Sequence, residues 1–292
     1  MSAADIHHTG VGRTSDAPVR DALGGAIDAL AAAGVETPRL DAEVLLCEAT
    51  GWARADLATD PGRGVAPPAG RRFGEMVRRR LRREPVAYIV GRKGFRHLEL
   101  AVDRRVLIPR PETELLVELA LELRPRRLLD VGTGSGAIAL AVAHELPDCE
   151  VAATDTSAAA LEVARGNAER LGLSERVRFV EGAVPGDEAA GAGFDLVLAN
   201  LPYVSEAEWG SLQPEVTEWE PREALLAGPD GLAAIRATIP AMSELAPVLA
   251  LEVGQGQAET VAAMLHDGGL AVETRRDLAG IERVVVGRRS AP

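Results

Sequence analysis

Residues 128–136 read LLDVGTGSG, and this run decides the fold. Its leucines, Asp130 and Val131 belong to a strand expected over residues 126–131, and its glycines open a helix expected over residues 137–146. Glycines there allow a tight turn and a close approach of the backbone to a ligand, and a helix N-terminus attracts negative charge. The same spacing fits the Gly-x-Gly-x-x-Gly/Ala fingerprint of dinucleotide sites, so the run alone leaves NAD and S-adenosylmethionine both open.

Strands and helices alternate from this run to the end of the chain. We expect further strands over residues 150–155, 177–181, 194–199 and 248–253, with helices over residues 157–171, 231–245 and 257–266. Strands separated by helices of this length predict a mostly parallel, doubly wound α/β sheet. The short link between two last strands, residues 270–275 and 282–286, predicts an antiparallel hairpin at the sheet edge.

The N-terminal third has helical spacing instead. Apolar residues at positions 23, 27 and 30 predict a first helix, Pro38 suits the start of a second, and a third is expected over residues 69–83. That third helix carries seven arginines, which form either a solvated face or a docking surface for an acidic or RNA-associated partner. Residues 94–109 change to period two and predict a β-hairpin with its turn at residues 103–105.

The charge of the chain is uneven. The 292 residues carry a formal net charge of −12. Residues 1–95 hold 14 basic and 12 acidic side chains, whereas residues 96–292 hold 18 and 32. A globally acidic chain is poorly suited to wrapping a nucleic-acid backbone, which calls for a basic stripe. No apolar run approaches the ~20 residues of a membrane-spanning helix, so no membrane contact is expected.

The cysteines and the N-terminus indicate the compartment. Cys47 and Cys149 stand far apart without a zinc-binding pattern, which argues against a disulfide framework and a structural metal. The N-terminus lacks the apolar segment of a secretory signal. We therefore expect a cytoplasmic protein with reduced thiols.

Two further motifs follow expected strands. Asp155 ends the strand after the glycine run, where an acid meets ribose hydroxyls in nucleotide sites, and it fits either cofactor. The tetrad of residues 200–203, NLPY, follows the strand over residues 194–199. Such a tetrad is typical of methyltransferases that modify planar amide or amine nitrogens, and it decides in favour of S-adenosylmethionine.

The tetrad suggests its own chemistry. The Asn200 side-chain oxygen and the Leu201 carbonyl can each accept one N–H of a substrate –NH₂, which fixes the nitrogen against the methyl group. Tyr203 can pack on the amide plane. No histidine or carboxylate base is required before attack, and none is evident nearby in the sequence.

Taken together, these residues resemble the PrmC/HemK family of release factor glutamine N5-methyltransferases, from about Asp21 onward. Further segments carry the resemblance: residues 85–91 (PVAYIVG), Phe95, residues 106–114 (VLIPRPETE), residues 129–140, Glu220-Pro221 and Leu251-Glu252. The run at 106–114 is the most specific, because generic methyltransferases lack it. The family usually has Asn-Pro-Pro-Tyr, so Leu201 replaces a rigid proline here and is expected to loosen the positioning of the amide.

The resemblance implies a seven-stranded, Rossmann-like S-adenosylmethionine-dependent methyltransferase domain preceded by a small helical domain and a β-hairpin linker. The expected parts are a flexible tail (1–18), a helical substrate-docking domain (19–92), the linker (93–110) and the methyltransferase domain (111–292). The substrate implied is the glutamine of the Gly-Gly-Gln motif in peptide chain release factors. No metal and no direct nucleic-acid contact are expected, and a monomer fits a large protein partner.

Site residues follow from the same resemblance. The catalytic residues expected are Asn200, Leu201, Pro202 and Tyr203. The cofactor-binding residues expected are Phe95, Arg110, Pro111, Glu112, Thr113, Asp130, Gly132, Thr133, Gly134, Ser135, Gly136, Asp155 and Asn200. Some relatives carry an aromatic residue near the adenine where this chain has Gly-Ala-Val at 182–184, so no adenine contact is assigned there.

Three alternatives stay open from the residues alone. An adenine-N6 methyltransferase of DNA or RNA shares the tetrad, although the acidic C-terminal two-thirds and the 106–114 run argue against it. A binding protein that has lost catalysis is the second alternative, with Leu201 as its hint. An NAD dehydrogenase is the third.

Overall fold

A computed structural model describes residues 16–184 and 193–289 of the chain. The chain divides into two compact units, residues 1–90 and residues 91–292. Residues 1–15 of the expected tail lie outside the described residues. The last residues of that segment form the short strand β1 (Ala17–Pro18), which pairs antiparallel with β2 (Gly64–Val65).

The first unit is helical, as expected. It contains α1 (Val19–Ala32), α2 (Pro38–Thr50), α3 (Arg54–Thr59), α4 (Pro67–Leu81) and α5 (Val86–Val90). Pro38 stands in the first turn of α2, where its missing N–H costs nothing. Leu30, Leu45 and Leu46 are fully buried and form the core with Phe73 of α4.

Several arginines of α4 and the turn after it serve the unit itself. Arg80 is buried and pairs with Asp41 at 2.6 Å, and Arg79 pairs with Glu84 at 2.5 Å. Arg83 donates to the backbone carbonyls of residues 33 and 34. These three arginines therefore have partners within the unit, whereas Arg71 and Arg78 are exposed and keep both the solvated-face and the docking-surface alternatives open.

The second unit begins with the expected hairpin, but its turn lies elsewhere. Strands β3 (Arg92–Phe95) and β4 (Leu98–Ala101) pair antiparallel around a turn at Arg96 and His97, so the turn expected at 103–105 is wrong. Arg96 holds a left-handed φ of 49° and is fixed by an ion pair with Glu145 at 2.6 Å. Asp103 instead starts a separate turn that leads out of the hairpin, because its carbonyl accepts the N–H of residue 106.

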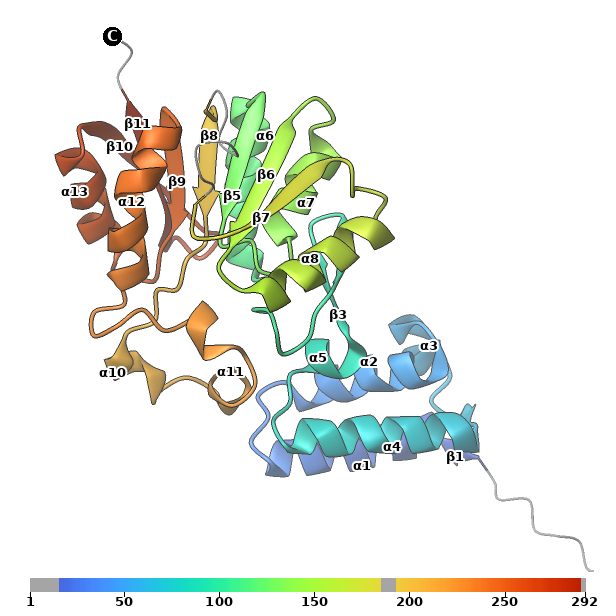
Figure 1. Ribbon diagram of the computed structural model, residues 1–292. Coiled ribbons are helices and arrows are strands. Elements are labelled where there is room, and N and C mark those ends of the chain that lie inside the picture. The colour runs from blue at the N-terminus through green and yellow to red at the C-terminus, as the bar shows by residue number, and fades with distance from the viewer. Residues whose placement is uncertain (1–15, 185–192, 290–292) are drawn as a thin grey trace, which may run out of the picture. The chain divides into compact units, whose positions relative to one another are not determined.

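The remaining elements alternate along the chain as expected (Figure 1). They are η1 (Pro111–Thr113), α6 (Glu114–Leu123), β5 (Arg127–Val131), α7 (Ala137–Glu145), β6 (Glu150–Asp155), α8 (Ala158–Arg170), β7 (Val177–Glu181), β8 (Leu196–Ala199), α10 (Glu206–Trp209), α11 (Pro214–Thr217), η2 (Arg222–Ala224), α12 (Ala233–Leu245), β9 (Val248–Glu252), α13 (Ala258–Asp267), β10 (Leu270–Arg276) and β11 (Glu282–Arg289). The helices α6, α10 and α11 were not expected from the sequence.

Seven strands form one sheet in the order β10-β11-β9-β8-β5-β6-β7. Strand β11 runs antiparallel to both of its neighbours, and the other pairs are parallel. The expected class of fold, a helical domain followed by a seven-stranded methyltransferase sheet, is confirmed. Strand β11 lies between β10 and β9. The expected hairpin therefore forms at the sheet edge, with β10 as the edge strand and β11 as its neighbour.

Period-two alternation assigns the two faces of this sheet. Leu128 packs in a core with helices α6 and α7, and Leu129 packs in a second core with α12 and α13. The register pairs Val131 with Ala199 and Ala199 with Leu251, so the chain leaves β5, β8 and β9 at one end of the sheet. This end is where a doubly wound fold binds its ligand.

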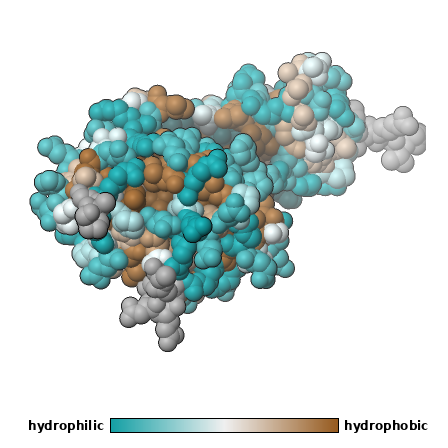
Figure 2. All heavy atoms as spheres, turned by 90° about the horizontal axis from the view of Figure 1, so that it is seen from above, coloured by the Kyte–Doolittle hydropathy of each residue, from teal (hydrophilic) through white to brown (hydrophobic). Residues whose placement is uncertain are grey.

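The surface is predominantly polar. Figure 2 shows one face of the molecule, on which hydrophilic side chains surround smaller hydrophobic areas. Among the described residues, the large hydrophobic side chains classed as exposed are Leu40 and Leu278. None of the helices described here is long and apolar enough to cross a membrane.

Candidate functional site

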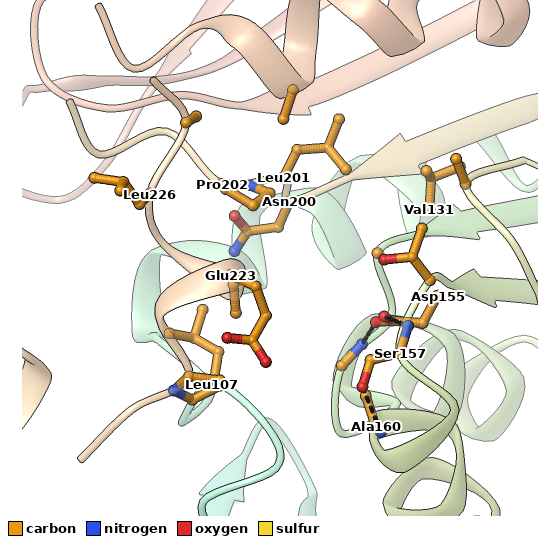
Figure 3. Close-up of a pocket in the computed structure, with 18 of the residues that line it drawn as sticks. Leu107, Val131, Asp155, Ser157, Ala160, Asn200, Leu201, Pro202, Glu223 and Leu226 are labelled. Carbon is orange, nitrogen blue, oxygen red and sulfur yellow. Dashed lines mark hydrogen bonds between the residues drawn. The ribbon is translucent and has the colours of Figure 1, made fainter. Parts of the chain in front are cut away.

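A cavity of about 430 Å³ opens in the second unit at the carboxyl ends of the central strands. The tetrad residues Asn200, Leu201 and Pro202 lie on one side, and Asp155 and Ser157 lie on another (Figure 3). The rest of the lining comes from the glycine turn, the segment after β7, residues 105–107 and the stretch from Pro221 to Thr238. Its volume is within the range of sites for small molecules and cofactors.

The glycine turn brings the backbone of β5 against the tetrad. Gly132 has a φ of +75°, and a Cβ added there would lie 3.2 Å from Leu201 Cδ2 and 3.4 Å from the Asn200 carbonyl oxygen. The N–H groups of Gly132 and Thr133 both donate to the Thr154 carbonyl at 2.9 Å, which ties the turn to β6. Glycine is needed at this position both for its backbone angle and for the space beside the tetrad.

Asp130 lies beneath this turn. Its Oδ2 accepts the Thr133 hydroxyl at 2.6 Å and the Ala139 N–H at 3.1 Å, so it fastens the turn to α7. Its Oδ1 has no hydrogen-bond partner within the described residues, although it is buried. Burial raises the pKa of this carboxyl to about 7, the nearby Asp155 adds to the rise, and the two hydrogen bonds partly oppose it.

Asp155 stands at the end of β6 and lines the cavity, as expected. Its Oδ2 accepts the Gly134 N–H and its Oδ1 accepts the Ser157 N–H, both at 2.9 Å. Ser157 in turn caps α8 by accepting the Ala160 N–H. A carboxylate has about four lone-pair sites, so two remain for a vicinal diol.

The tetrad is oriented by a residue from the 106–114 run. The Asn200 Nδ2 donates to the Thr113 hydroxyl at 3.0 Å. With the amide nitrogen committed, the Asn200 Oδ1 is the atom that remains to accept a substrate N–H. Leu201 is buried and packs on the glycine turn, so its side chain fills the space beside Gly132.

Tyr203 does not line the cavity. Its hydroxyl points to Glu252 and donates to Oε1 at 3.4 Å. Burial, reinforced by the charge of Glu252, raises the pKa of Tyr203 far above its usual range, so the phenol stays protonated. Its carbonyl accepts from Gln257, which holds the end of the tetrad against the start of α13.

Sequence reasoning assigned Glu252 no role at this site, although Leu251-Glu252 is one of the segments that carry the family resemblance. It ends β9 with 1 % of its surface exposed, and burial raises its pKa to about 7. No carboxylate is evident near the tetrad in the sequence, but the fold brings the Glu252 carboxyl against Tyr203. A signal was present, since Glu252 ends a strand on the same face as Asn200, but it required the adjacency and register of β8 and β9.

Glu220 anchors the 106–114 run. Its Oε2 accepts the Ile108 N–H at 3.0 Å and its Oε1 accepts from Arg110 at 2.5 Å. Next to it, the Arg104 guanidinium stacks over Trp219 at 4.3 Å. These contacts hold residues 105–107 and the segment after Pro221 together as one wall of the cavity.

The structure brings six expected residues to the cavity lining: Gly132, Gly134, Asp155, Asn200, Leu201 and Pro202. It places the others around or behind that lining: Phe95, Arg110, Pro111, Glu112, Thr113, Asp130, Thr133, Ser135, Gly136 and Tyr203. Phe95 is 2 % exposed within the core under α6 and α7. Lining residues that were not assigned to the site include Gly182 and Ala183, which follow β7. They also include Glu223 of η2 and Thr238 of α12, for which Glu220-Pro221 was the nearest sequence signal.

The chemistry of these donors and acceptors fits a nucleoside that carries cationic groups. Asp155 offers acceptors for a ribose diol at the cavity lining, and Asp130 adds a second carboxyl buried beneath the glycine turn. Two carboxylates near the glycine turn favour such a ligand over a diphosphate. Within the described ranges, no group of three or more histidine, cysteine or acidic residues is arranged to hold a metal ion.

Comparisons with known proteins agree with this arrangement. Residues 21–91 match the model of the PrmC N-terminal domain, and residues 111–213 match that of the methyltransferase small domain. The chain is 42% identical to the release factor glutamine methyltransferase of Nitratidesulfovibrio vulgaris, over 95% of this chain and 97% of that protein. It is 44% identical to the protein of the same description from Xylella fastidiosa, over 89% and 96%.

Solved structures agree at the level of fold. The hMettl16 catalytic domain in complex with the MAT2A 3′UTR hairpin 1 superposes with a TM-score of 0.53 at 16% identity, over 78% of this chain and 84% of that chain. At this identity the likeness shows the methyltransferase fold alone.

Proposed function

Since this chain belongs to the release factor glutamine methyltransferase family, we propose how its own residues carry out that reaction. It is a protein-glutamine N5-methyltransferase of class I that uses S-adenosylmethionine, and the function predicted from the sequence is confirmed. The roles of individual residues, the docking of the substrate and the compartment are the subject of the proposal.

The cofactor is held by the glycine turn and the two aspartates. Asp155 accepts from the ribose hydroxyls at the cavity lining, and Asp130, buried beneath the turn, fixes the turn through its hydrogen bonds to Thr133 and Ala139. The cofactor, when bound, supplies a methyl group on a positively charged sulfur. Because Gly132 has no side chain, its backbone can lie against the tetrad and still leave room for the cofactor.

The substrate glutamine is held by the tetrad. A carboxamide nitrogen is a poor nucleophile because its lone pair is delocalised, so the enzyme must orient it and support the positive charge that develops on it. Asn200 Oδ1 accepts one N–H and the Leu201 carbonyl accepts the other. The observation that carries this proposal is the hydrogen bond from Asn200 Nδ2 to Thr113, because it turns the amide oxygen of Asn200 toward the substrate.

Mass spectrometry tests this reading directly. Purified release factor incubated with the enzyme and S-adenosylmethionine should gain one methyl group on the glutamine of its Gly-Gly-Gln motif. Asn200→Ala should lower the rate by at least about a hundredfold, since one aligned acceptor is lost. Its affinity for S-adenosylmethionine in calorimetry should stay near that of the wild type. Full activity of Asn200→Ala would refute the mechanism, and methylation of duplex DNA in a parallel reaction would favour the adenine alternative.

The first unit docks the release factor in this proposal. Arg71 and Arg78 are exposed arginines of α4 whose replacement leaves the ion pairs of Arg72, Arg79 and Arg80 in place. A double substitution of these two by glutamate should weaken release-factor binding and leave cofactor affinity unchanged. Arg39→Glu, at an exposed position on α2, is the matched control. If the double variant binds release factor as tightly as Arg39→Glu does, the exposed arginines of α4 form a solvated face and do not dock the substrate.

The enzyme acts as a monomer in the cytoplasm in this proposal, because release factors work there and a single chain holds the whole site. Light scattering of the complex with release factor should give one copy of each protein. A stable dimer of the free enzyme would contradict the monomer.

A further inference from the structure

The side chain of Gln257 joins three segments of the second unit. Its Nε2 donates to the Tyr203 carbonyl at 2.9 Å and to the Gly231 carbonyl at 3.5 Å. Its Oε1 accepts the Gly254 N–H at 2.9 Å. These contacts link the end of the tetrad, the turn after β9 and the segment that leads from η2 to α12. A primary amide offers an acceptor and two N–H donors at one end of a side chain, so it suits this place.

The surrounding backbone leaves this amide little freedom. A Cβ added to Gly254 would lie 2.9 Å from Gln257 Oε1, and one added to Gly231 would lie 2.8 Å from Gln257 Nε2. Both distances are shorter than van der Waals contact, so any other residue at either position would push the amide away. The two glycines therefore allow Gln257 to reach the tetrad.

Gln257 makes these contacts in place of a helix cap. It is the N-cap residue of α13, yet its side chain forms no capping hydrogen bond to that helix. Serine, threonine, aspartate and asparagine are favoured at such positions because their side chains stabilise the helix start. Residues that depart from a local rule of this kind concentrate at functional sites. The position of the Gln257 amide therefore points to a role outside α13.

The carbonyl that Gln257 anchors lies close in the chain to a substrate acceptor. Leu201 and Pro202 line the cavity, and the Leu201 carbonyl is the acceptor proposed for one substrate N–H (Figure 3). Pro202 alone stands between Leu201 and Tyr203, and its ring fixes its own φ. The other proposed acceptor, Asn200 Oδ1, is oriented from a different element by the bond to η1. The two acceptors are therefore held by separate anchors.

We propose that Gln257 is a positioning residue for methyl transfer, which holds the Tyr203 carbonyl so that the Leu201 carbonyl stays aimed at the substrate amide. This inference rests on the proposed function of the tetrad. Without the Gln257 amide, the backbone after Pro202 is free to rotate, and the Leu201 acceptor loses its fixed direction. A misplaced acceptor slows the chemical step. The glycine turn and Asp155 follow other strands, so the cofactor site stays intact.

Single-turnover methylation of purified release factor by enzyme preloaded with S-adenosylmethionine tests this role. Gln257→Ala should lower the transfer rate by about tenfold or more, since one acceptor is displaced. Its calorimetric affinities for S-adenosylmethionine and for release factor should change less than the rate. Gln255→Ala is the matched control, because it removes the same amide from an exposed position in the same turn and should transfer at the wild-type rate. A wild-type rate for Gln257→Ala, or an equal loss of rate and cofactor affinity, would overturn the proposal.

Gly254→Ala is an independent test that keeps Gln257 and does not depend on Gln257→Ala folding well. Gly254 has no positive φ, so alanine fits its backbone. The added Cβ meets the far end of the flexible Gln257 side chain and displaces its amide at a small cost to the fold. The transfer rate should fall as it does for Gln257→Ala, with cofactor affinity again less affected. A wild-type rate for Gly254→Ala would overturn the proposal.

The double variant separates the two routes by which Gly254→Ala can act. If it acts through the Gln257 amide, it should cause no further loss in the Gln257→Ala background, where that amide is absent. A full further loss would trace the effect to the Tyr203 ring, which lies 3.2 Å from the same Cβ, and would overturn the proposal.

The proposed function and this inference fail in different ways. If Asn200→Ala is impaired while Gln257→Ala and Gly254→Ala transfer the methyl group at the wild-type rate, the proposed function stands and this inference fails. Full activity of Asn200→Ala would refute the tetrad mechanism itself, and this inference with it.

Discussion

Asp130→Asn should change the stability of the protein in opposite directions at low and high pH. The folded state raises the pKa of Asp130 from 3.8 to about 7, because the side chain is fully buried. Below pH 3.8 the carboxyl is protonated in both states and its stability contribution is fully present. As the pH rises through 7 that contribution is lost, since the unfolded chain releases the proton freely and the folded protein must ionise a buried group. A shift of this size corresponds to about 4 kcal/mol.

The asparagine side chain of Asp130→Asn cannot ionise, but it lowers the stability of the folded protein in another way. Asparagine can keep its oxygen at the Oδ2 position, bonded to Thr133 and Ala139, which leaves an NH₂ at the partnerless Oδ1 position. An unsatisfied buried donor costs about 1–3 kcal/mol. Asp130→Asn should therefore be less stable than wild type at pH 4 and more stable at pH 8.

Thermal unfolding of the cofactor-free protein followed by circular dichroism measures this change. The difference in Tm between variant and wild type should swing by on the order of 8–16 °C between pH 4 and pH 8, at roughly 2–4 °C per kcal/mol for a unit of this size. Asp267→Asn, at an exposed position in α13, is the control and should show no swing. A Tm difference for Asp130→Asn that is the same at both pH values would refute the reasoning.

Three other substitutions probe the walls of the cavity. Glu220→Gln keeps an acceptor for the Ile108 N–H but removes the charge paired with Arg110, so Tm should fall by the equivalent of about 1–3 kcal/mol and KM for release factor should rise; an unchanged Tm and KM would contradict this. Gly132→Ala adds a Cβ 3.2 Å from the Leu201 side chain at a φ of +75°, so the turn must shift. Calorimetry should show S-adenosylmethionine affinity reduced by at least about tenfold, whereas near-wild-type affinity would show that the turn accommodates the methyl group. Leu201→Pro restores the family's residue and a rigid φ, so kcat should rise by a few-fold while the lost leucine packing costs about 1–3 kcal/mol of stability; a lower kcat would show that the leucine itself suits this site.

The central strands could be predicted from sequence because each is a local signal. The strands at residues 150–155 and 177–181 have the bounds expected for them, since runs of apolar residues end there at glycine or aspartate. The order of the strands is not local. Nothing near residues 282–289 indicates that β11 inserts between β10 and β9.

One unassigned helix and one misplaced turn also have physical causes. The run ELLVELALEL at residues 114–123 alternates in its second half, so its period does not distinguish a strand from the helix α6 that forms. The hairpin turn at Arg96 contains no glycine or asparagine to announce it. Its left-handed backbone is held by Glu114 and Glu145, which lie 18 and 49 residues away in the chain. Tertiary contacts, which are invisible to a local pattern, fix that turn.

The site residues show the same difference between local signals and tertiary contacts. Asp155 and Asn200 were found because each follows its own strand, whereas Glu252 required knowledge of which strand lies beside β8. The site has two carboxyls with a strongly raised pKa, Asp130 and Glu252. Both are buried, and each has one oxygen without a hydrogen-bond partner among the described residues. Each destabilises the folded protein at neutral pH, and a hydrophobic or amide side chain would avoid that cost. Local features that lower stability concentrate at functional sites.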